Sequence, residues 1–500
     1  MSSEYDDSLG ADVPAVPVTP ATGALPLVAE AYDAAPPTDA VPVVPVAPAA
    51  YDPAPPTGAI PVVPVVPVVP AAYDPAPPTG AIPVASPAEP AGYDPVPPAT
   101  PPVPDAGYGL DTVPPPLDQW QFAPYLRWSM QNIETFLPVR RISRDERVTA
   151  FGSRPAELGT LSVAHPWENR AATFAEVMQT THTDGWMVLH RGALVAEEYV
   201  GSYGPGAMHL LMSVSKSLTA TTAGLLSTSR RLDLEAPVTS YVPELVGSGY
   251  DGALVRHLID MRTGVRFSEE YLNDDAEVRL LEEAIGWAPK RHAGVPGTLL
   301  GFLATLGQEG PHGGAFDYKS CETDVLGFVL EGAAGEHAAD VMAEQLWKPM
   351  GAEFDANVGV DSAGAGMFDG GVSAAMRDLA RFGHLFVNNG LALDGAPVIP
   401  EAWVADTFNG GPDSRQAFSA SPEPTFMPGG MYRNGFWFPG ESADVMLALG
   451  IHGQMIYMNR ATGVVGVKLS SWPTPQDAEK LFWTVRAFDA ASWALETGAA

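Results

Sequence analysis

The chain has 500 residues and carries 59 acidic against 27 basic side chains, a formal net charge of −32 at pH 7. This acidic balance argues against nucleic acid or an anionic membrane surface as a binding partner. A single cysteine, Cys321, excludes an intrachain disulfide and fits a reducing compartment.

The first 116 residues differ in composition from the rest of the chain. They hold 31 of the 51 prolines and 13 acidic residues but no lysine or arginine, and an approximate repeat restarts at Tyr32, Tyr51, Tyr73 and Tyr93. Dense proline fixes φ and removes amide donors, so a packed solenoid is disfavoured. We expect residues 1–116 to form a disordered tail, or alternatively an array of ligands for a proline-recognising protein partner, and residues 117–500 to form one globular domain.

No targeting or membrane-spanning segment is predicted. The opening "MSSEYDDSLG" is acidic where a signal peptide would be basic, and "IPVVPVVPVVPAA" is interrupted by proline at every third residue. These features lead us to expect a cytoplasmic protein that does not bind a membrane.

Two elements are predicted around residue 200. "GWMVLHRGALVAEEYVG" alternates on either side of "HRG" and predicts a β-hairpin from Met187 to Val200. The small and apolar residues between Ser213 and Leu226 predict a buried helix that ends at the polar stretch "STSRRLD".

The C-terminal part predicts strands followed by a helix. "VMLALGIHGQMIYMNRATGVVGVKLSSW" indicates two or three antiparallel strands joined at "NRATG", and "PQDAEKLFWTVRAFDAASWALET" has apolar residues at helical spacing. Strands at both ends of a long helical middle predict an α+β sandwich in which distant parts of the chain share one antiparallel sheet, flanked by helices and carrying an inserted, mainly helical subdomain.

Ser213 and Lys216 lie three residues apart, so on a helix they share one face. A serine in the first turn lies at the positive end of the helix dipole, and a buried lysine one turn later can act as its base. The same spacing also arises by chance, with the lysine simply extending to solvent. The pair alone therefore leaves both interpretations open.

Further motifs follow in order. "FDYKSCETDVLGFVLE" places Tyr318 and Ser320 just before a helical stretch, and "GIHGQMIYM" places His452 and Gln454 on a predicted strand. Together with "SVSKS", "DMRTGVRFSEEYL" and "GGVSAAMRDLARFG", these motifs resemble the β-lactamase and penicillin-binding-protein superfamily of serine hydrolases. The resemblance extends over residues 120–495 and is greatest to the 6-aminohexanoate-dimer hydrolases, which degrade nylon oligomers, and to esterases related to class C β-lactamases.

The resemblance implies a β-lactamase/transpeptidase-like fold and a set of catalytic roles. Ser213 would be the nucleophile, Lys216 its activating partner and Tyr318 the carrier of the proton between nucleophile and leaving group. The backbone N–H groups of Ser213 and Gln454 would form the oxyanion hole. The substrate would be a small amide or ester, with no cofactor and no metal, and the ten histidines show no metal-ligand spacing.

The resemblance also implies substrate-binding residues, which are Tyr271, Ser320, His452 and Asp369. The chain departs from the antibiotic-hydrolysing members at one place, because Ile451-His452-Gly453 stands where they carry Lys-Thr-Gly or Lys-Ser-Gly. Serine also replaces the usual asparagine at position 320. Both departures favour an amidase or esterase over a β-lactamase.

Three alternatives to an amidase remain open at this point. They are a carboxylesterase without useful amidase activity, a β-lactamase, and a non-catalytic scaffold on the same fold. The presence of Ser213, Lys216 and Tyr318 together disfavours the scaffold.

Overall fold

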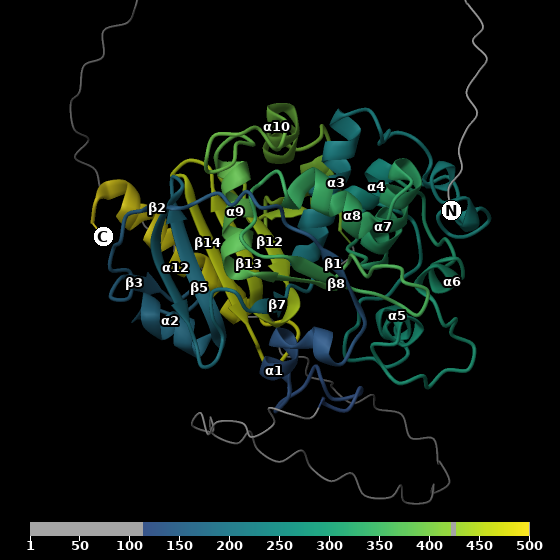
Figure 1. Cartoon of the computed structure of the whole chain (residues 1–500), viewed down its shortest axis with the longest axis horizontal. Coiled ribbons are helices and arrows are strands. Elements are labelled where there is room, and N and C mark those ends of the chain that lie inside the picture. The colour runs from purple at the N-terminus through teal and green to yellow at the C-terminus, as the bar shows by residue number, and fades with distance from the viewer. Residues whose placement is uncertain (1–113, 422–426, 500) are drawn as a thin grey trace, which may run out of the picture. The chain divides into compact units, whose positions relative to one another are not determined.

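The computed structural model of the chain describes residues 114–421 and 427–499 (Figure 1). Of the tail predicted over residues 1–116, residues 1–113 lie outside the described residues. The helices are α1 (Leu126–Gln131), α2 (Phe174–Thr180), α3 (Val214–Thr228), α4 (Val255–Ile259), α5 (Glu277–Ile285), α6 (Leu299–Leu303), α7 (Cys321–Ala334), α8 (Ala338–Met342), α9 (Met376–Val387), α10 (Glu401–Asn409), α11 (Ser414–Ser419) and α12 (Ala478–Thr497).

The strands form three sheets. Their bounds are β1 (Val139–Ile142), β2 (Gly152–Ser153), β3 (Ser162–Ala164), β4 (Ala171–Thr173), β5 (Thr183–His190), β6 (Ala193–Tyr199), β7 (Met208–Leu210), β8 (Ala356–Gly359), β9 (Val372–Ala375), β10 (Met431–Arg433), β11 (Phe436–Phe438), β12 (Val445–Gly450), β13 (Gln454–Asn459) and β14 (Val464–Ser470).

The main sheet has eight strands in the order β10-β11-β12-β13-β14-β5-β6-β2. All neighbouring pairs are antiparallel except β2 and β6, and β14 joins the C-terminal strands to the hairpin β5–β6. This confirms the prediction of an antiparallel sheet that is assembled from distant parts of the chain.

Helices cover both faces of this sheet. A methyl group at Gly383 of α9 would meet Val465, whereas one at Gly466 would meet the ring of Phe488 on α12. Because neighbouring residues of a strand point to opposite faces, α9 and α12 lie on opposite sides of β14. The predicted C-terminal helix is thus the outer layer of a sandwich (Figure 1).

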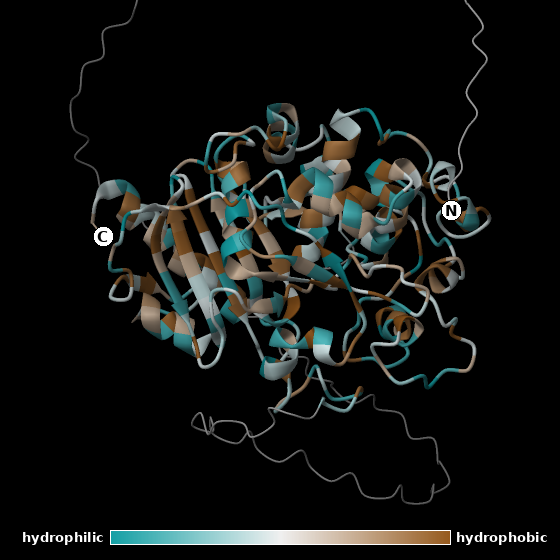
Figure 2. Cartoon of the chain, viewed as in Figure 1, coloured by the Kyte–Doolittle hydropathy of each residue, from teal (hydrophilic) through white to brown (hydrophobic). Residues whose placement is uncertain are grey.

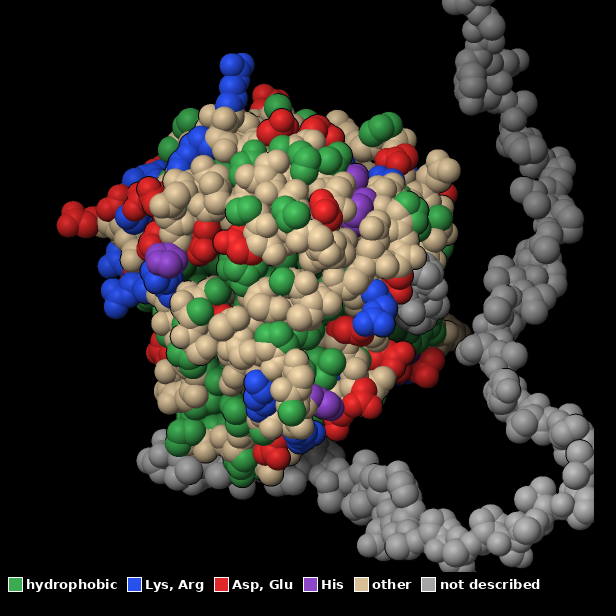
Figure 3. All heavy atoms as spheres, turned by 90° about the vertical axis from the view of Figure 1, so that its right-hand side faces the viewer, with side chains coloured by type: hydrophobic (Ala, Val, Ile, Leu, Met, Phe, Trp, Pro, Cys, Tyr) green, Lys and Arg blue, Asp and Glu red, His purple; other side chains and the backbone are tan. Residues whose placement is uncertain are grey.

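The helical part of the fold lies beside the sheet. Helices α3 to α8 occupy one side in Figure 1, where the small sheet β1-β8-β9-β7 connects them to the rest. Hydrophobic residues concentrate in the strands and on the inner sides of helices, and many helices show both a hydrophobic and a hydrophilic side (Figure 2). Acidic and basic side chains are interspersed on the face shown in Figure 3.

One predicted strand is corrected by the structure. Residues 451–453 form a tight turn between β12 and β13, and His452 has φ 60°, so the strand begins only at Gln454. The alternation of "GIHGQMIYM" does not reveal this turn, because an apolar residue and glycines flank the histidine. Within residues 114–421 and 427–499, none of the helices has the length and hydrophobicity to cross a membrane.

Candidate active site

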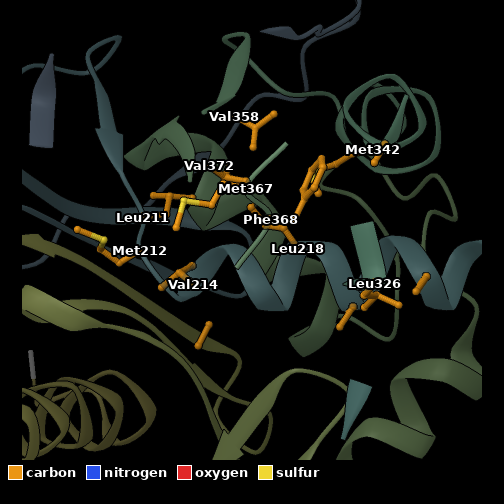
Figure 4. Close-up of a cluster of buried hydrophobic side chains, with 14 of the residues drawn as sticks. Leu211, Met212, Val214, Leu218, Leu326, Met342, Val358, Met367, Phe368 and Val372 are labelled. Atoms are coloured by element: carbon orange, nitrogen blue, oxygen red, sulfur yellow. The ribbon is translucent and has the colours of Figure 1, made fainter. Parts of the chain in front are cut away.

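Ser213 lies at the junction between β7 and α3. The preceding residue, Met212, has φ 48°, an uncommon conformation that turns the chain sharply from strand to helix. Ser213 is the N-cap of α3 and is partly exposed, whereas most residues of the helix after it are buried. Figure 4 shows buried hydrophobic side chains along this helix, among them Leu218 on α3, Leu326 on α7 and Val372 on β9. The nucleophile predicted from sequence is therefore held on a rigid element and remains accessible.

Lys216 is buried and makes three polar contacts through its ammonium nitrogen. Nζ lies 2.9 Å from Ser213 Oγ, 3.0 Å from Ser320 Oγ and 2.8 Å from the carbonyl oxygen of Asp369. Only 2% of this lysine is exposed. The interpretation in which Lys216 extends to solvent is therefore wrong.

Tyr318 is the third predicted member of this cluster. Its hydroxyl lies near the side chain of Ser213, and Lys216 Nζ lies 5.1 Å from the centre of its ring. Burial raises the pKa of Tyr318 well above its usual value. The ring packs beside Trp437 on β11, 5.3 Å between centroids, and this contact fixes its position.

A loop before α5 reaches the same place. The hydroxyl of Tyr271 donates to the carboxylate of Glu269, and the other oxygen of Glu269 accepts the backbone N–H of Ser320. Burial raises the pKa of Glu269, and the positive charge of Lys216 opposes this increase. Glu269 thus links Tyr271 to the loop that carries Tyr318 and Ser320.

Asp369 is buried against Lys216 and Ser320. Its backbone N–H donates to Asp324 Oδ1 over 3.0 Å, and its carbonyl is the one that Lys216 contacts. Burial raises the pKa of both carboxyl groups, that of Asp324 most strongly. Asp324, on α7, therefore helps to hold the segment that positions the lysine.

The turn between β12 and β13 comes close to the nucleophile. A methyl group at Gly450 would lie 3.1 Å from Ser213 N, 3.1 Å from Gln454 Cβ and 2.5 Å from the carbonyl oxygen of Leu211. Only glycine allows this approach. The two residues predicted to supply the oxyanion hole, Ser213 and Gln454, are consequently brought together.

The structure does not bring His452 into the site. The residue is 1% exposed, and its Nδ1 donates to the carbonyl of Trp472 over 2.7 Å. Burial lowers the pKa of His452 to about 4. Its predicted contact with substrate has no geometric support, because its ring is hydrogen-bonded to Trp472 and the residue is not among those that line the cavity at Ser213.

A cavity of about 30 Å³ opens at Ser213. Tyr271, Ser320, Asp369 and Ile451 are among its lining residues, so three of the four predicted substrate-binding residues lie on it. A second cavity, of about 90 Å³, lies next to the first, and the two share Trp120, Gln121, Glu282 and Trp287.

Several of these residues were missed by the sequence analysis. Glu269 stands within the quoted stretch "FSEEYL" and could have been noticed there, whereas Asp324 and Glu282 carry no local signal. Glu282 accepts from Gln121 Nε2 over 2.9 Å and pairs with Arg279 over 2.9 Å. The described residues contain no cluster of three or more side chains suited to holding a metal.

Known proteins share sequence with this chain. The family model described as "Beta-lactamase" matches residues 170–490. A 6-aminohexanoate-dimer hydrolase from Paenarthrobacter ureafaciens is 37% identical over 365 residues, which are 72% of this chain and 89% of that protein.

Solved structures share the fold. A protein from Bacillus anthracis assigned as a 6-aminohexanoate-dimer hydrolase superposes with a TM-score of 0.70 at 24% identity, over 76% of this chain and 97% of that chain. A protein from Bacteroides dorei DSM 17855 assigned as a β-lactamase superposes with a TM-score of 0.50 at 18% identity, over 64% of this chain and 96% of that chain. With a family model that covers more than half of its residues and a relative of 37% identity, the chain belongs to the β-lactamase family of serine hydrolases.

Proposed function

We propose that this enzyme cleaves small linear amides or esters through an acyl-enzyme on Ser213. The observation that carries the proposal is the 2.9 Å contact between Lys216 Nζ and Ser213 Oγ on the wall of a cavity. In the first step Ser213 Oγ attacks the carbonyl carbon and gives its proton to Lys216 Nζ. Tyr318 gives its own hydroxyl proton to the leaving group and regains one from Lys216. The leaving amine or alcohol then departs with a proton, and water hydrolyses the ester formed on Ser213.

The contacts of Lys216 suit both of its protonation states. As a neutral amine, Nζ accepts the proton of Ser213 while its two N–H groups donate to Ser320 Oγ and Asp369 O. As an ammonium, it donates to all three oxygens. Because no hydrogen bond is lost when the proton moves, the base does not need its surroundings to rearrange during acylation.

Tyr318 is the proposed proton donor to the leaving group. Its raised pKa keeps the hydroxyl protonated at neutral pH, and its position near Ser213 supports its role as donor to the leaving group. The backbone N–H groups of Ser213 and Gln454 are proposed to stabilise the negative oxygen of the tetrahedral intermediate.

The proposed substrate is a slender chain of the 6-aminohexanoate-dimer type. The name of the relative at 37% identity supports this, and Tyr271, Ser320 and Asp369 line the cavity at Ser213. Ile451 lines the cavity where the antibiotic-hydrolysing members carry lysine, so an antibiotic carboxylate has no ammonium to bind there. The single cysteine fits the cytoplasmic location that we propose with it.

Labelling with a fluorophosphonate probe tests the nucleophile. We expect the probe to modify the wild type on Ser213, Ser213→Ala to remain unlabelled, and the exposed Ser202→Ala control to label normally. The kcat/KM values for a nitrophenyl ester and for the aminohexanoate dimer then separate amidase from pure esterase. Labelling of a folded Ser213→Ala variant would exclude the proposal.

A further inference from the structure

Lys468 is buried, as Lys216 and Lys319 are, and it has no part in the proposed mechanism. Lys468, on β14, is 0% exposed, and its Nζ donates to Thr181 O over 3.0 Å and to Ser470 Oγ. It also lies 5.4 Å from the centre of the Trp472 ring. Burial lowers the pKa of this lysine to about 7, so its amine is held at a cost in free energy.

Ser470, a partner of Lys468, also contacts Gln454. The side-chain amide of Gln454 clamps the backbone of Ser470: Oε1 accepts the Ser470 N–H over 3.0 Å, and Nε2 donates to the Ser470 carbonyl over 2.8 Å. Ser470 is also the residue whose hydroxyl Lys468 holds. Lys468 therefore fixes the strand end against which Gln454 is anchored.

Trp472 forms a second connection to the same turn. Its indole N–H donates to Thr181 O over 2.8 Å, the oxygen that also accepts from Lys468. Its backbone N–H donates to the carbonyl of His452 over 3.0 Å, and a methyl group at Gly453, where φ is 93°, would meet its ring at 2.2 Å. The turn just before Gln454 thus packs against Trp472, and Trp472 in turn contacts Lys468.

The other proposed oxyanion donor is the backbone N–H of Ser213, and the strand before it contacts a cluster around Asp184. Buried Asp184 on β5 accepts from the hydroxyl of Ser471, pairs with Arg127 over 2.6 Å, and contacts His209 Nε2 over 3.0 Å. His209 lies on β7, the strand that leads to Ser213. Because Ser471 directly follows Ser470, the two clusters meet at the end of β14.

We propose that Lys468 is a positioning residue that fixes the backbone amide of Gln454 in the oxyanion hole. The inference rests on the proposed function, since it assigns Lys468 to the same acylation step. An oxyanion donor acts on the transition state more than on bound substrate, so its displacement lowers kcat and leaves KM almost unchanged. A lysine that only stabilised the fold would instead lower the melting temperature without changing kcat of the folded protein.

The test compares Lys468→Met with a matched control, Lys348→Met, in the full chain. Lys348 is partly exposed and pairs with Glu344 one helical turn away. With a nitrophenyl ester, we expect kcat of Lys468→Met to fall roughly 10- to 100-fold while KM stays within about twofold, and the control to match the wild type. Phosphonate labelling of Ser213 should slow in parallel.

A second variant keeps the test decisive if Lys468→Met does not fold. Ser470→Ala removes only the hydroxyl between Lys468 and the clamped backbone, and we expect a fall in kcat of about 3- to 10-fold. Wild-type kcat in a folded Lys468→Met or Ser470→Ala protein overturns this inference and leaves the proposed function intact. A wild-type enzyme without hydrolysis or labelling at Ser213 overturns both.

Discussion

Among single residues, the proposed mechanism gives proton transfer to Lys216 and Tyr318. Lys216→Ala removes the group 2.9 Å from Ser213 Oγ, and we expect acylation to fall by roughly 10²- to 10⁴-fold or more. Tyr318→Phe keeps the packing on Trp437 but removes the proton donor, so we expect a loss of similar size. Single-turnover measurement of acylation with a nitrophenyl ester checks both variants.

The comparison between an ester and an amide sharpens this prediction. An amine leaves only after it has been protonated, whereas a nitrophenolate leaves without a proton. Tyr318→Phe should therefore reduce hydrolysis of the aminohexanoate dimer more than hydrolysis of the nitrophenyl ester. Equal losses on the two substrates would contradict the role of Tyr318 as donor to the leaving group.

We expect Ile451, rather than His452, to limit the binding of β-lactams. Without the lysine that the antibiotic-hydrolysing members carry, one charge-assisted hydrogen bond to the carboxylate is missing, worth about 1.5–3 kcal/mol. His452 does not replace it, since it faces Trp472 and its pKa of about 4 keeps it neutral at mildly acidic pH.

We therefore expect kcat/KM for a chromogenic cephalosporin to lie well below that for the nitrophenyl ester at both pH 5.5 and pH 7. The ratio of the two values should not change between these pH values. A selective rise for the cephalosporin at the lower pH would show that His452 reaches the substrate after all.

At the scale of elements, the sequence predicted best where the pattern is local. The hairpin β5–β6 turns at Arg191 and Gly192, both with positive φ, and the alternation on either side of "HRG" was sufficient to find it. Helix α3 was found because small and apolar residues end at a polar stretch. The turn at His452 was missed because its conformation depends on Trp472, which lies 20 residues later.

In the candidate site, too, the sequence identified only residues that lie in a local pattern. The sequence identified Ser213, Lys216 and Tyr318 because each lies in a motif, and the structure brings all three together. Asp324 and Lys468 could not be identified, since their contacts join segments that are 45 and 287 residues apart. Contacts of this kind are set by the packing of the whole sheet and helix layer, which no window of sequence contains.

Helix α9 carries a histidine whose burial makes stability depend on pH. His384 packs under the β5–β6 turn, where a methyl group at Gly192 would be 3.2 Å from its ring, and desolvation lowers its pKa from 6.5 to about 4. As pH falls from 6.5 to 4, His384 binds a proton in the unfolded chain but stays neutral in the folded protein. The stability contributed by neutral His384 is therefore complete above pH 6.5 and is lost toward pH 4.

His384→Leu should remove this dependence. Between pH 7 and pH 4.5, we expect the unfolding free energy of the wild type to drop by roughly 1–3 kcal/mol more than that of the variant. Urea denaturation at the two pH values provides the measurement, and His452 titrates alike in both proteins, so the difference reports on residue 384. An identical drop in the two proteins would show that His384 is solvated.

At the scale of the whole molecule, the start of the described chain belongs to the active site. Trp120 Nε1 donates to the carbonyl of Trp287 over 3.0 Å, and Gln121 donates to Glu282. Both residues line the two cavities. The sequence predicted the boundary of the globular domain near residue 117 from composition, but it gave no reason to expect a wall of the site immediately after it.

Two truncations distinguish the contribution of residues 1–113 to catalysis from that of the segment that contains Trp120. Deletion of residues 1–113 should leave kcat/KM for the nitrophenyl ester within about twofold of the full chain, because every described residue that lines the cavity or contacts Ser213 is kept. Deletion of residues 1–122 also removes Trp120, which is 1% exposed, and loss of such a side chain costs about 3–5 kcal/mol. We expect this shorter protein to melt at a lower temperature and to show a raised KM.

The variant Trp120→Phe, made in the chain that begins at residue 114, controls for packing alone. It keeps an aromatic ring against Trp287 but removes the hydrogen bond to the Trp287 carbonyl. Its melting temperature should therefore be higher than that of the protein that lacks residues 1–122 and close to that of the protein that begins at residue 114. If the protein that begins at residue 114 folds normally but loses more than about tenfold in kcat/KM, a factor that corresponds to 1.4 kcal/mol, residues 1–113 take part in hydrolysis. The catalytic unit would then extend beyond the sandwich, and the predicted boundary near residue 117 would be wrong.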